Sequence, residues 1–301
     1  MLRAGTIDDV PRAAAMRQRA WPNLIIDEEG MRHSLESVPH RAELALFAFE
    51  DDGGLVGWAT ASREWQRSEP DHGGLTIAVE PTRRGEGIGS ALAAAAERHL
   101  VELGIATTHA GSLDEPGARA LGARLGYSIV GASSTSAVDP RGVEPLPIPD
   151  DVRLVPFGEL DDPRPVYELD LEVARDIPHE VYDAVTLEEW TREFWRTPFI
   201  DPDASLAAYV DGELAALTMI RVDRPTGRAH NNLAGTLRRY RGRGLATLVK
   251  SHSLRRTAEL GVTNAITDND ETNAAMLAVN RKLGYRPFAR RLEWERVTDA
   301  S

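Results

Sequence analysis

The sequence contains no cysteine, which excludes disulfides, thiolate metal sites and cysteine nucleophiles. Lysine is scarce as well. Only Lys250 and Lys282 stand among the 35 basic residues, so a Schiff-base mechanism has few candidates. Long hydrophobic runs are also missing. The run from Leu44 to Phe49 is among the longest, whereas a membrane-spanning helix needs about 20 residues. The N-terminus reaches acidic residues and Pro11 too soon for a secretory signal. We therefore expect a cytoplasmic protein with no membrane partner.

An excess of positive charge is absent too. The formal net charge is −12, which argues against a nucleic-acid partner and is compatible with a cationic small substrate. The eight histidines form no H-x-x-x-H or H-E-x-x-H motif, and no G-x-S-x-G motif occurs. The sequence therefore predicts neither a metal site nor a serine hydrolase.

What the chain does contain is a core and a repeat. With 301 residues and 42% hydrophobic residues, it is long enough for two domains of about 150 residues each. Arg84–Gly89 recurs as Arg241–Ala246, at an offset of 157. Two further landmarks, Glu-Leu-Gly and Leu-Gly-Tyr, recur at nearly the same offset. Three landmarks in register indicate a tandem repeat.

The boundary between the copies lies in a proline-rich stretch. Four prolines fall between Pro140 and Pro149, a composition that continues neither a helix nor a central strand. We expect an N-terminal domain at 1–138, a linker at 139–151 and a C-terminal domain at 152–301. Each half predicts the same order: a helix, a hairpin, a strand, a glycine-rich loop, a helix, a short strand and a last helix.

The glycine-rich loop carries the strongest chemical signal. Gly242 and Gly244 let the backbone approach a ligand closely, and the first N–H groups of the following helix have no intrahelical partner. Together with the helix dipole, these groups predict an anion site that suits a pyrophosphate. The loop fits neither the Walker pattern, since it has no lysine, nor the G-x-G-x-x-G pattern. A tight turn without a ligand is the alternative reading.

Both halves, each with such a loop, resemble the GCN5-related N-acetyltransferase (GNAT) family. Its signature, Arg/Gln-x-x-Gly-x-Gly/Ala after a strand, matches Arg84–Gly89 and Arg241–Ala246. The resemblance covers nearly the whole chain. It implies an α/β fold of two tandem GNAT-like domains, each with a mixed, mostly antiparallel, splayed sheet flanked by helices. It also implies acetyl-CoA as the cofactor.

The resemblance further implies which residues hold the cofactor, through loop amides and the preceding strand. In the second copy these are Thr236, Leu237, Arg238, Arg241, Gly242, Arg243, Gly244, Leu245, Ala246, Thr247, Asn273 and Asn280. In the first copy they are Val79, Arg84, Gly85, Gly87, Ile88 and Gly89.

The two copies differ in the family's second motif, an Asn-containing helix that ends at Leu-Gly-Tyr. The second copy keeps it with Asn273 and Asn280, whereas the first copy has Glu115 and Gly122 at those positions. Pro116 and its neighbouring glycine are expected to weaken the start of that helix in the first copy. The C-terminal half is therefore expected to be catalytic. A chain with one degenerate copy resembles two-domain family members such as mycothiol synthase.

The resemblance implies direct transfer of an acetyl group to the amine of a small molecule. The Leu237 amide would polarise the thioester carbonyl. Many family members carry a tyrosine at the position of Asn280 to protonate the thiolate, so Tyr285 or a water is expected to supply that proton here. The candidates for the general base are Asp176, His179, Glu189, Glu193, His230 and Asp268.

Several alternatives stay open. Trp190, Phe194 and Trp195 could line an acceptor pocket, although the spacing of the first two favours the core face of an amphipathic helix. A non-catalytic CoA-binding or regulatory protein is the alternative to an enzyme. The acceptor could be an antibiotic amine, an amino-sugar thiol precursor, a polyamine or a protein N-terminus, and the oligomeric state is not indicated.

Overall fold

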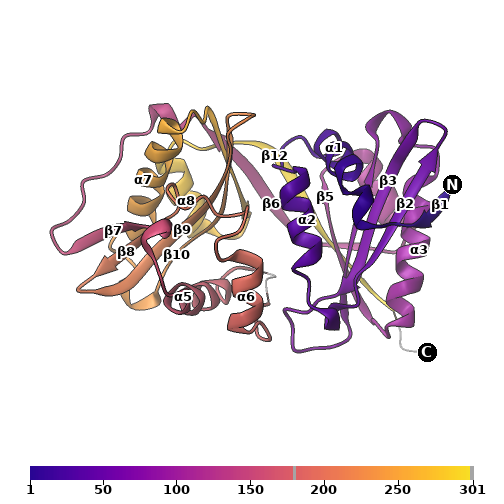
Figure 1. Cartoon of the computed structure of the whole chain (residues 1–301), viewed down its shortest axis with the longest axis horizontal. Coiled ribbons are helices and arrows are strands. Elements are labelled where there is room, and N and C mark those ends of the chain that lie inside the picture. Colours follow the sequence, from indigo (N-terminus) through magenta and orange to yellow (C-terminus); the bar gives the residue numbers. More distant parts are fainter. Residues whose placement is uncertain (179–180, 299–301) are drawn as a thin grey trace. The chain divides into compact units, whose positions relative to one another are not determined.

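The computed structural model describes residues 1–178 and 181–298, which form two compact units (Figure 1). The first unit contains Met1–Ala132, Asp183–Val185 and the chain from Arg290. The second contains Ser133–Tyr182 and Thr186–Ala289. Within these described ranges, no helix combines the length and the apolar composition needed to cross a bilayer.

The first unit is a sheet with helices. Its strands and helices are β1 (Leu2–Ala4), β2 (Ala45–Asp51), β3 (Gly54–Arg63), β4 (His72–Val79), β5 (Thr107–Leu113), α1 (Val10–Ala20), α2 (Glu28–Glu36), α3 (Ile88–Glu102) and α4 (Pro116–Arg124). The strand order is β1-β2-β3-β4-β5, followed by β12 (Arg286–Val297). Neighbouring strands in this order are antiparallel, except that β4 and β5 are parallel.

The second unit repeats this plan. Its strands and helices are β7 (Val152–Pro156), β8 (Leu206–Val210), β9 (Glu213–Asp223), β10 (Arg228–Thr236), β11 (Asn264–Asp270), α5 (Arg164–Ala174), α6 (Leu187–Phe194), α7 (Leu245–Glu259) and α8 (Ala274–Lys282). The strand order starts at β6 (Ser128–Val138) and runs β6-β11-β10-β9-β8-β7. Strands β10 and β11 are parallel, and the other neighbouring strands are antiparallel. The predicted fold class is confirmed.

The last strand of each repeat takes part in the unit of the other repeat. Strand β6 (Ser128–Val138) follows the first repeat, but its segment from Ser133 pairs with β11 in the second unit. Strand β12 (Arg286–Val297) follows the second repeat, and its segment from Arg291 pairs with β5 in the first unit. Residues 139–151, the predicted linker, lie in the second unit, where Val143 joins the core.

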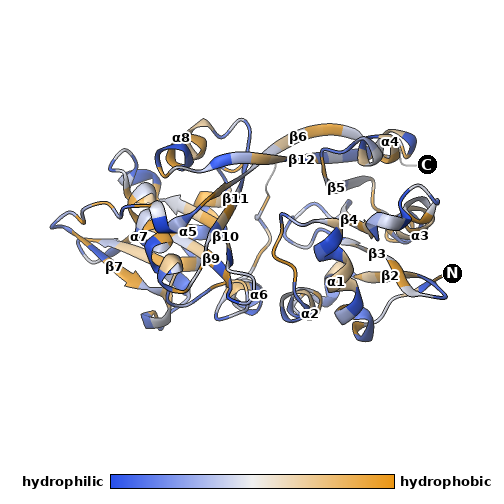
Figure 2. Ribbon diagram, turned by 90° about the horizontal axis from the view of Figure 1, so that it is seen from above, coloured by the Kyte–Doolittle hydropathy of each residue, from blue (hydrophilic) through white to orange (hydrophobic). Residues whose placement is uncertain are grey.

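Successive side chains of a strand point to opposite faces of the sheet, and each face packs against a different helix. In the first unit, Leu75 of β4 packs with Leu100 of α3, while Ala78 packs with Met16 of α1. In the second unit, β9 is buried from Leu214 to Arg221, as expected for a central strand that is covered on both faces. Figure 2 labels this strand and colours each residue by its hydropathy. Each parallel strand pair is therefore covered by helices.

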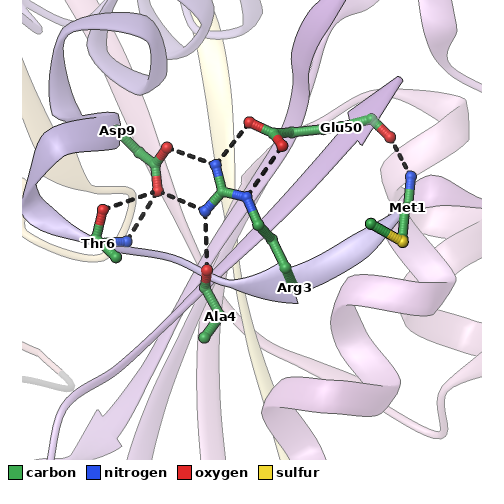
Figure 3. Close-up of polar contacts among 6 residues, drawn as sticks. All are labelled: Met1, Arg3, Ala4, Thr6, Asp9 and Glu50. Atoms are coloured by element: carbon green, nitrogen blue, oxygen red, sulfur yellow. Dashed lines mark hydrogen bonds and ion pairs between the residues drawn. The ribbon is translucent and has the colours of Figure 1, made fainter. Parts of the chain in front are cut away.

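The N-terminal strand is held in place by a charge cluster on Arg3 (Figure 3). The Arg3 Nη2 atom lies 2.6 Å from Asp9 Oδ1 and 2.6 Å from Glu50 Oε1. The Thr6 amide donates to Asp9 Oδ2 at 2.9 Å, just before the helical turn that leads into α1. The Arg3 guanidinium lowers the pKa of the Asp9 carboxyl by hydrogen bonding. The cluster links β1, β2 and the start of α1.

Candidate active site

The parallel strands of the second unit pair only over a short stretch. Pairing of β10 with β11 runs from Arg228↔Asn264 to Asn231↔Thr267, while β10 continues to Thr236. Between β4 and β5 the recorded pairing likewise covers four residue pairs. Beyond these pairs, the described part of β11 does not pair with the edge of β10 that faces it, so the backbone groups of this edge are available to an extended ligand.

The alternation of backbone groups decides which amides face this gap. The Leu237 N–H donates to the Ala215 carbonyl at 2.9 Å, so this amide is engaged on the β9 side. Neighbouring residues of a strand direct their N–H groups to opposite edges. The Thr236 amide, rather than the predicted Leu237 amide, therefore lies at the gap. The next amide, that of Arg238, donates to Glu172 Oε1 at 2.8 Å.

The loop after β10 has the geometry expected of an anion site. Gly242 and Gly244 have φ angles of 79° and 78°, in the left-handed region that glycine adopts without strain. A Cβ atom built on either would meet no described atom within 4 Å. The first bond of α7 is from the Leu248 N–H to the Gly244 carbonyl, at 3.0 Å. The preceding amides, including those of Leu245, Ala246 and Thr247, therefore have no intrahelical partner and are available to a phosphate.

The corresponding loop of the first unit is built in the same way. Gly85 and Gly87 have φ angles of 86° and 84°, and a Cβ atom on either would also meet open space among the described atoms. Arg84 pairs with Glu115 at 2.9 Å. Ile88 turns into the core with 3% of its surface exposed. Both loops thus fit a phosphate group by backbone geometry.

Acidic residues hold the arginines of the second loop. Asp176 pairs with Arg238 at 2.5 Å and with Arg241. Arg243 pairs with Asp151. Hydrogen bonds from Arg238 and Arg241 lower the pKa of Asp176 to about 2. A carboxylate with so low a pKa is a poor proton acceptor at neutral pH, so Asp176 fits a positioning role better than the predicted role of general base.

The two asparagines of the second motif do different things. Asn273 precedes α8, and its side chain accepts a hydrogen bond from the Met276 N–H at 3.1 Å. Asn280 is 3% exposed; its Oδ1 accepts from Lys250 Nζ at 2.8 Å, and its Nδ2 donates to Asn269 Oδ1 at 2.5 Å. Asn273 is thus a helix cap, whereas Asn280 is the centre of a buried polar row.

Lys250 is the residue of this row that sequence reasoning missed. Its side chain is fully buried on α7, and Nζ lies 5.1 Å from the ring centroid of Tyr285. Burial lowers the pKa of Lys250 to about 7. Burial also raises the pKa of the Tyr285 hydroxyl far above its ordinary value, which makes Tyr285 a weak proton donor. The scarcity of lysine in the chain was the one available signal.

A histidine and an aspartate meet at the start of the gap. His230 Nε2 lies 2.9 Å from Asp268 Oδ2, and His230 Nδ1 lies 2.7 Å from Asn232 Oδ1. Asn232 is oriented by donating from Nδ2 to the Phe199 carbonyl at 2.9 Å. Two of the predicted base candidates are therefore brought together, on strands β10 and β11.

A pair of acids lies on the helices, with Asp170 on α5 and Glu193 on α6. Burial raises the pKa of Asp170 on α5 to about 6, and Trp190 Nε1 donates to its Oδ2 at 2.6 Å. Burial, and then the charge of Asp170, raise the pKa of Glu193 on α6 to about 7. Glu193 was among the predicted bases, whereas Asp170 was missed because its burial depends on α6. Glu189 instead caps α6 through Thr186.

The remaining candidates fall elsewhere. His179 lies outside the described residues. Trp190 is completely buried on α6, as the core reading of its spacing predicted. Trp195 lines a pocket of about 370 Å³ together with Phe157, Thr197 and Ile200. This pocket is an apolar hollow within the second unit, so Trp195 keeps the alternative reading of a pocket residue.

The first unit lacks the equivalents of these side chains. Gly74 lies opposite His109 in the strand register, as His230 lies opposite Ile266, so Gly74 replaces His230 in the first unit. Two residues after His109 and Ile266, Gly111 replaces Asp268. At Gly122, which replaces Asn280, a Cβ would lie 2.8 Å from the Trp294 ring. Helix α4 nevertheless begins at Pro116, which corrects the expectation that proline weakens it. Proline is tolerated in the first helical turn because its missing N–H would have no partner there.

The sequence matches the model of one known protein family over both of its halves. A sequence model of the Acetyltransferase (GNAT) family matches residues 13–127 and 166–285. No curated protein matches the sequence.

Solved structures share the tandem arrangement. A tandem GNAT protein from the clavulanic acid biosynthesis pathway superimposes with a TM-score of 0.74 and 22% identity, covering 100% of this chain and 99% of its own. A GCN5-related N-acetyltransferase from Sphaerobacter thermophilus gives a TM-score of 0.73 and 19% identity, over 99% and 95% of the two chains. At these identities the likeness concerns the fold.

Proposed function

Because the chain belongs to the GNAT family of acetyltransferases, we propose that its second unit transfers the acetyl group of acetyl-CoA to the amine of a small molecule. One observation carries the proposal. The unpaired edge of β10 leads directly into a loop whose glycines and helix-terminal amides suit a pyrophosphate. When bound, acetyl-CoA supplies an acetyl group as a thioester that an amine can attack.

Three side-chain differences favour the second unit as the catalytic one. His230 and Asp268 stand where the first unit has glycines, and Asn280 stands where Gly122 packs against an indole ring. The loops themselves are alike. The first unit is therefore proposed to bind CoA at most, without turnover.

The chain's residues would act on both sides of the reacting carbonyl. The Thr236 amide would donate a hydrogen bond to the carbonyl oxygen. As the amine nitrogen bonds to the carbonyl carbon and the carbon–sulfur bond breaks, the amine must lose a proton and the sulfur must gain one. Holding both reactants in one gap supplies much of the rate enhancement.

Glu193, which lies next to Asp170, is proposed to take the proton from the amine through a water, because none of the described contacts brings either carboxylate directly to the gap. A carboxylate with a pKa of about 7 is well matched to this task at neutral pH. His230 is a less direct acceptor, because both of its ring nitrogens already face oxygen atoms. We assign His230 and Asp268 to positioning the acceptor at the start of the gap.

Lys250 is proposed as the source of the proton for the sulfur. Asn280 lies where many relatives have a tyrosine, and Lys250 Nζ donates to it. The Asp268–Asn269 step places neighbouring side chains on opposite faces of β11. Asn269 joins the Lys250 row while Asp268 joins His230, so the proposed proton donor and the residues proposed to position the amine would lie on opposite faces of one strand.

The test is release of free CoA thiol from acetyl-CoA over a panel of small amines. We expect release by the intact protein, loss of release in Gly244→Asp, and little change in Gly87→Asp, which puts the same charge into the other loop. Loss in Gly87→Asp alone would assign catalysis to the first unit. Tight acetyl-CoA binding without release over the panel would favour the alternative, a CoA-binding or regulatory protein.

A further inference from the structure

A cluster of metal-ligating side chains lies in the first unit, away from the glycine-rich loop. Glu64 follows β3, His72 begins β4, and His109 lies on β5. One ligand atom from each lies within 4.8 Å of the others, and His72 Nδ1 is 3.0 Å from His109 Nε2. We propose that these three side chains bind one divalent transition-metal ion, with Zn²⁺ as the best-fitting ion.

The donor set suits such an ion. Two imidazoles and one carboxylate are common zinc ligands, with metal–ligand distances of about 2.1 Å, and they leave a position open for water. Ligand atoms around a tetrahedral ion at that distance lie roughly 3.4 Å apart. The imidazole nitrogens are already near this separation, so small side-chain rotations would complete the site.

The backbone holds the three ligands in place. The Glu64 N–H donates to the His72 carbonyl at 3.0 Å, which joins the ends of β3 and β4. Gly74 pairs with His109 across the parallel strands, which brings His72 and His109 diagonally together. Arg67 Nε donates to Glu64 Oε2 at 2.6 Å, which orients the carboxylate and leaves Oε1 for the ion.

The surrounding charges also favour a cation. Glu295 lies directly opposite His109 in the β12–β5 pairing and supplies a further carboxylate nearby. The positive charge of Arg67, which would disfavour a cation, is offset by the carboxylates of Glu64 and Glu69. Arg67 Nη1 lies 3.4 Å from Glu69 Oε2.

The proposed metal site of the first unit lies near the place that corresponds to the start of the gap in the second unit. Residues 72, 74, 76 and 78 share one face of β4, and Ala78 packs against α1 on that face. In the second unit, the equivalent strands carry His230 and Asp268 at the start of the gap. The first unit therefore has a metal site near the place where the second has polar side chains, and this inference does not depend on the proposed acetyl transfer.

The experiment is calorimetric titration of the metal-free whole chain with ZnCl₂, with thermal unfolding measured in parallel. We expect one equivalent to bind with a Kd in the micromolar range or below, and the protein to unfold at a higher temperature with Zn²⁺. The variant His72→Ala/His109→Ala should bind at least about 100-fold more weakly. His40→Ala, which removes an exposed histidine of the same unit, should bind like the unchanged protein.

Titration of the unchanged protein with Co²⁺ measures the coordination of the ion directly and requires no variant. The visible absorption of a four- or five-coordinate Co²⁺ ion is expected, and Zn²⁺ should abolish it. Binding only at millimolar Zn²⁺, equal binding by the double variant, or an octahedral Co²⁺ spectrum would each overturn the proposal.

Discussion

At the scale of single residues, Lys250 is difficult to explain by stability alone. A buried ammonium group is costly unless it is paired, and the partner of Lys250 among the described residues is one amide oxygen, that of Asn280. Because burial lowers the pKa of Lys250 from 10.5 to about 7, the folded state holds this proton less tightly than the unfolded state. The free energy of unfolding therefore falls as the pH drops from about 10.5 to 7 and stays reduced below that. Such a cost is typical of a functional residue.

Replacing this residue should separate stability from activity. We expect Lys250→Met to raise the free energy of unfolding at pH 7 by about 1–2 kcal/mol, since the buried charge is removed and one hydrogen bond is lost. The value of kcat should fall at least tenfold. Lys282→Met, which replaces the exposed second lysine, should change neither. Denaturant unfolding and thiol release measure the two effects, and an unchanged kcat would remove Lys250 from the mechanism.

The raised pKa of Glu193 predicts that the free energy of unfolding depends on pH in the opposite direction. Its pKa is raised from 4.5 to about 7, so the folded state binds this proton more tightly, and stability is lost as the pH rises from about 4.5 through 7. Glu193→Gln should therefore be the more stable protein at pH 8, by on the order of 2 kcal/mol, and indistinguishable at pH 4. Glu188→Gln, on the exposed side of α6, is the control. Equal pH profiles for all three proteins would contradict the raised pKa.

At the scale of elements, sequence reasoning succeeded where the signal is local. Gly242 and Gly244 mark the loop because only glycine adopts that backbone easily, and the helix after it follows from periodicity. The contacts of Lys250 with Asn280 could not be predicted, since they join two helices whose packing no motif records. Likewise, the pKa of Asp170 depends on α6 covering α5.

Helix α4 offers a prediction about the degenerate copy. Gly122→Ala should lower the free energy of unfolding by about 1–3 kcal/mol, because the added Cβ would lie 2.8 Å from the Trp294 ring. Gly117→Ala, in the same helix but with open space around it among the described atoms, should raise stability by up to about 1 kcal/mol. Denaturant unfolding measures both. Equal effects at the two glycines would show that Trp294 does not pack against Gly122.

At the scale of the whole molecule, the repeat in sequence and the units in space do not coincide. The landmarks predict two copies, and both occur, but β6 and β12 each enter the unit of the other copy. Pairing between strands far apart in the chain leaves no periodic signal at either strand, so the exchange was not predictable. The likeness to mycothiol synthase and the identity of the acceptor stay predictions.

The exchange has a consequence for fragments of the chain. A fragment of residues 133–289 contains the second unit with the β6 segment that covers β11, whereas residues 152–301 leave that strand edge unpaired and lose Val143 from the core. We expect the first fragment to unfold cooperatively and to bind acetyl-CoA, and the second to aggregate or to unfold without a sharp transition. Thermal unfolding followed by circular dichroism distinguishes them. Equal stability of the two fragments would mean that the β6 segment contributes little to the second unit, and the repeat boundary would then also be the folding boundary.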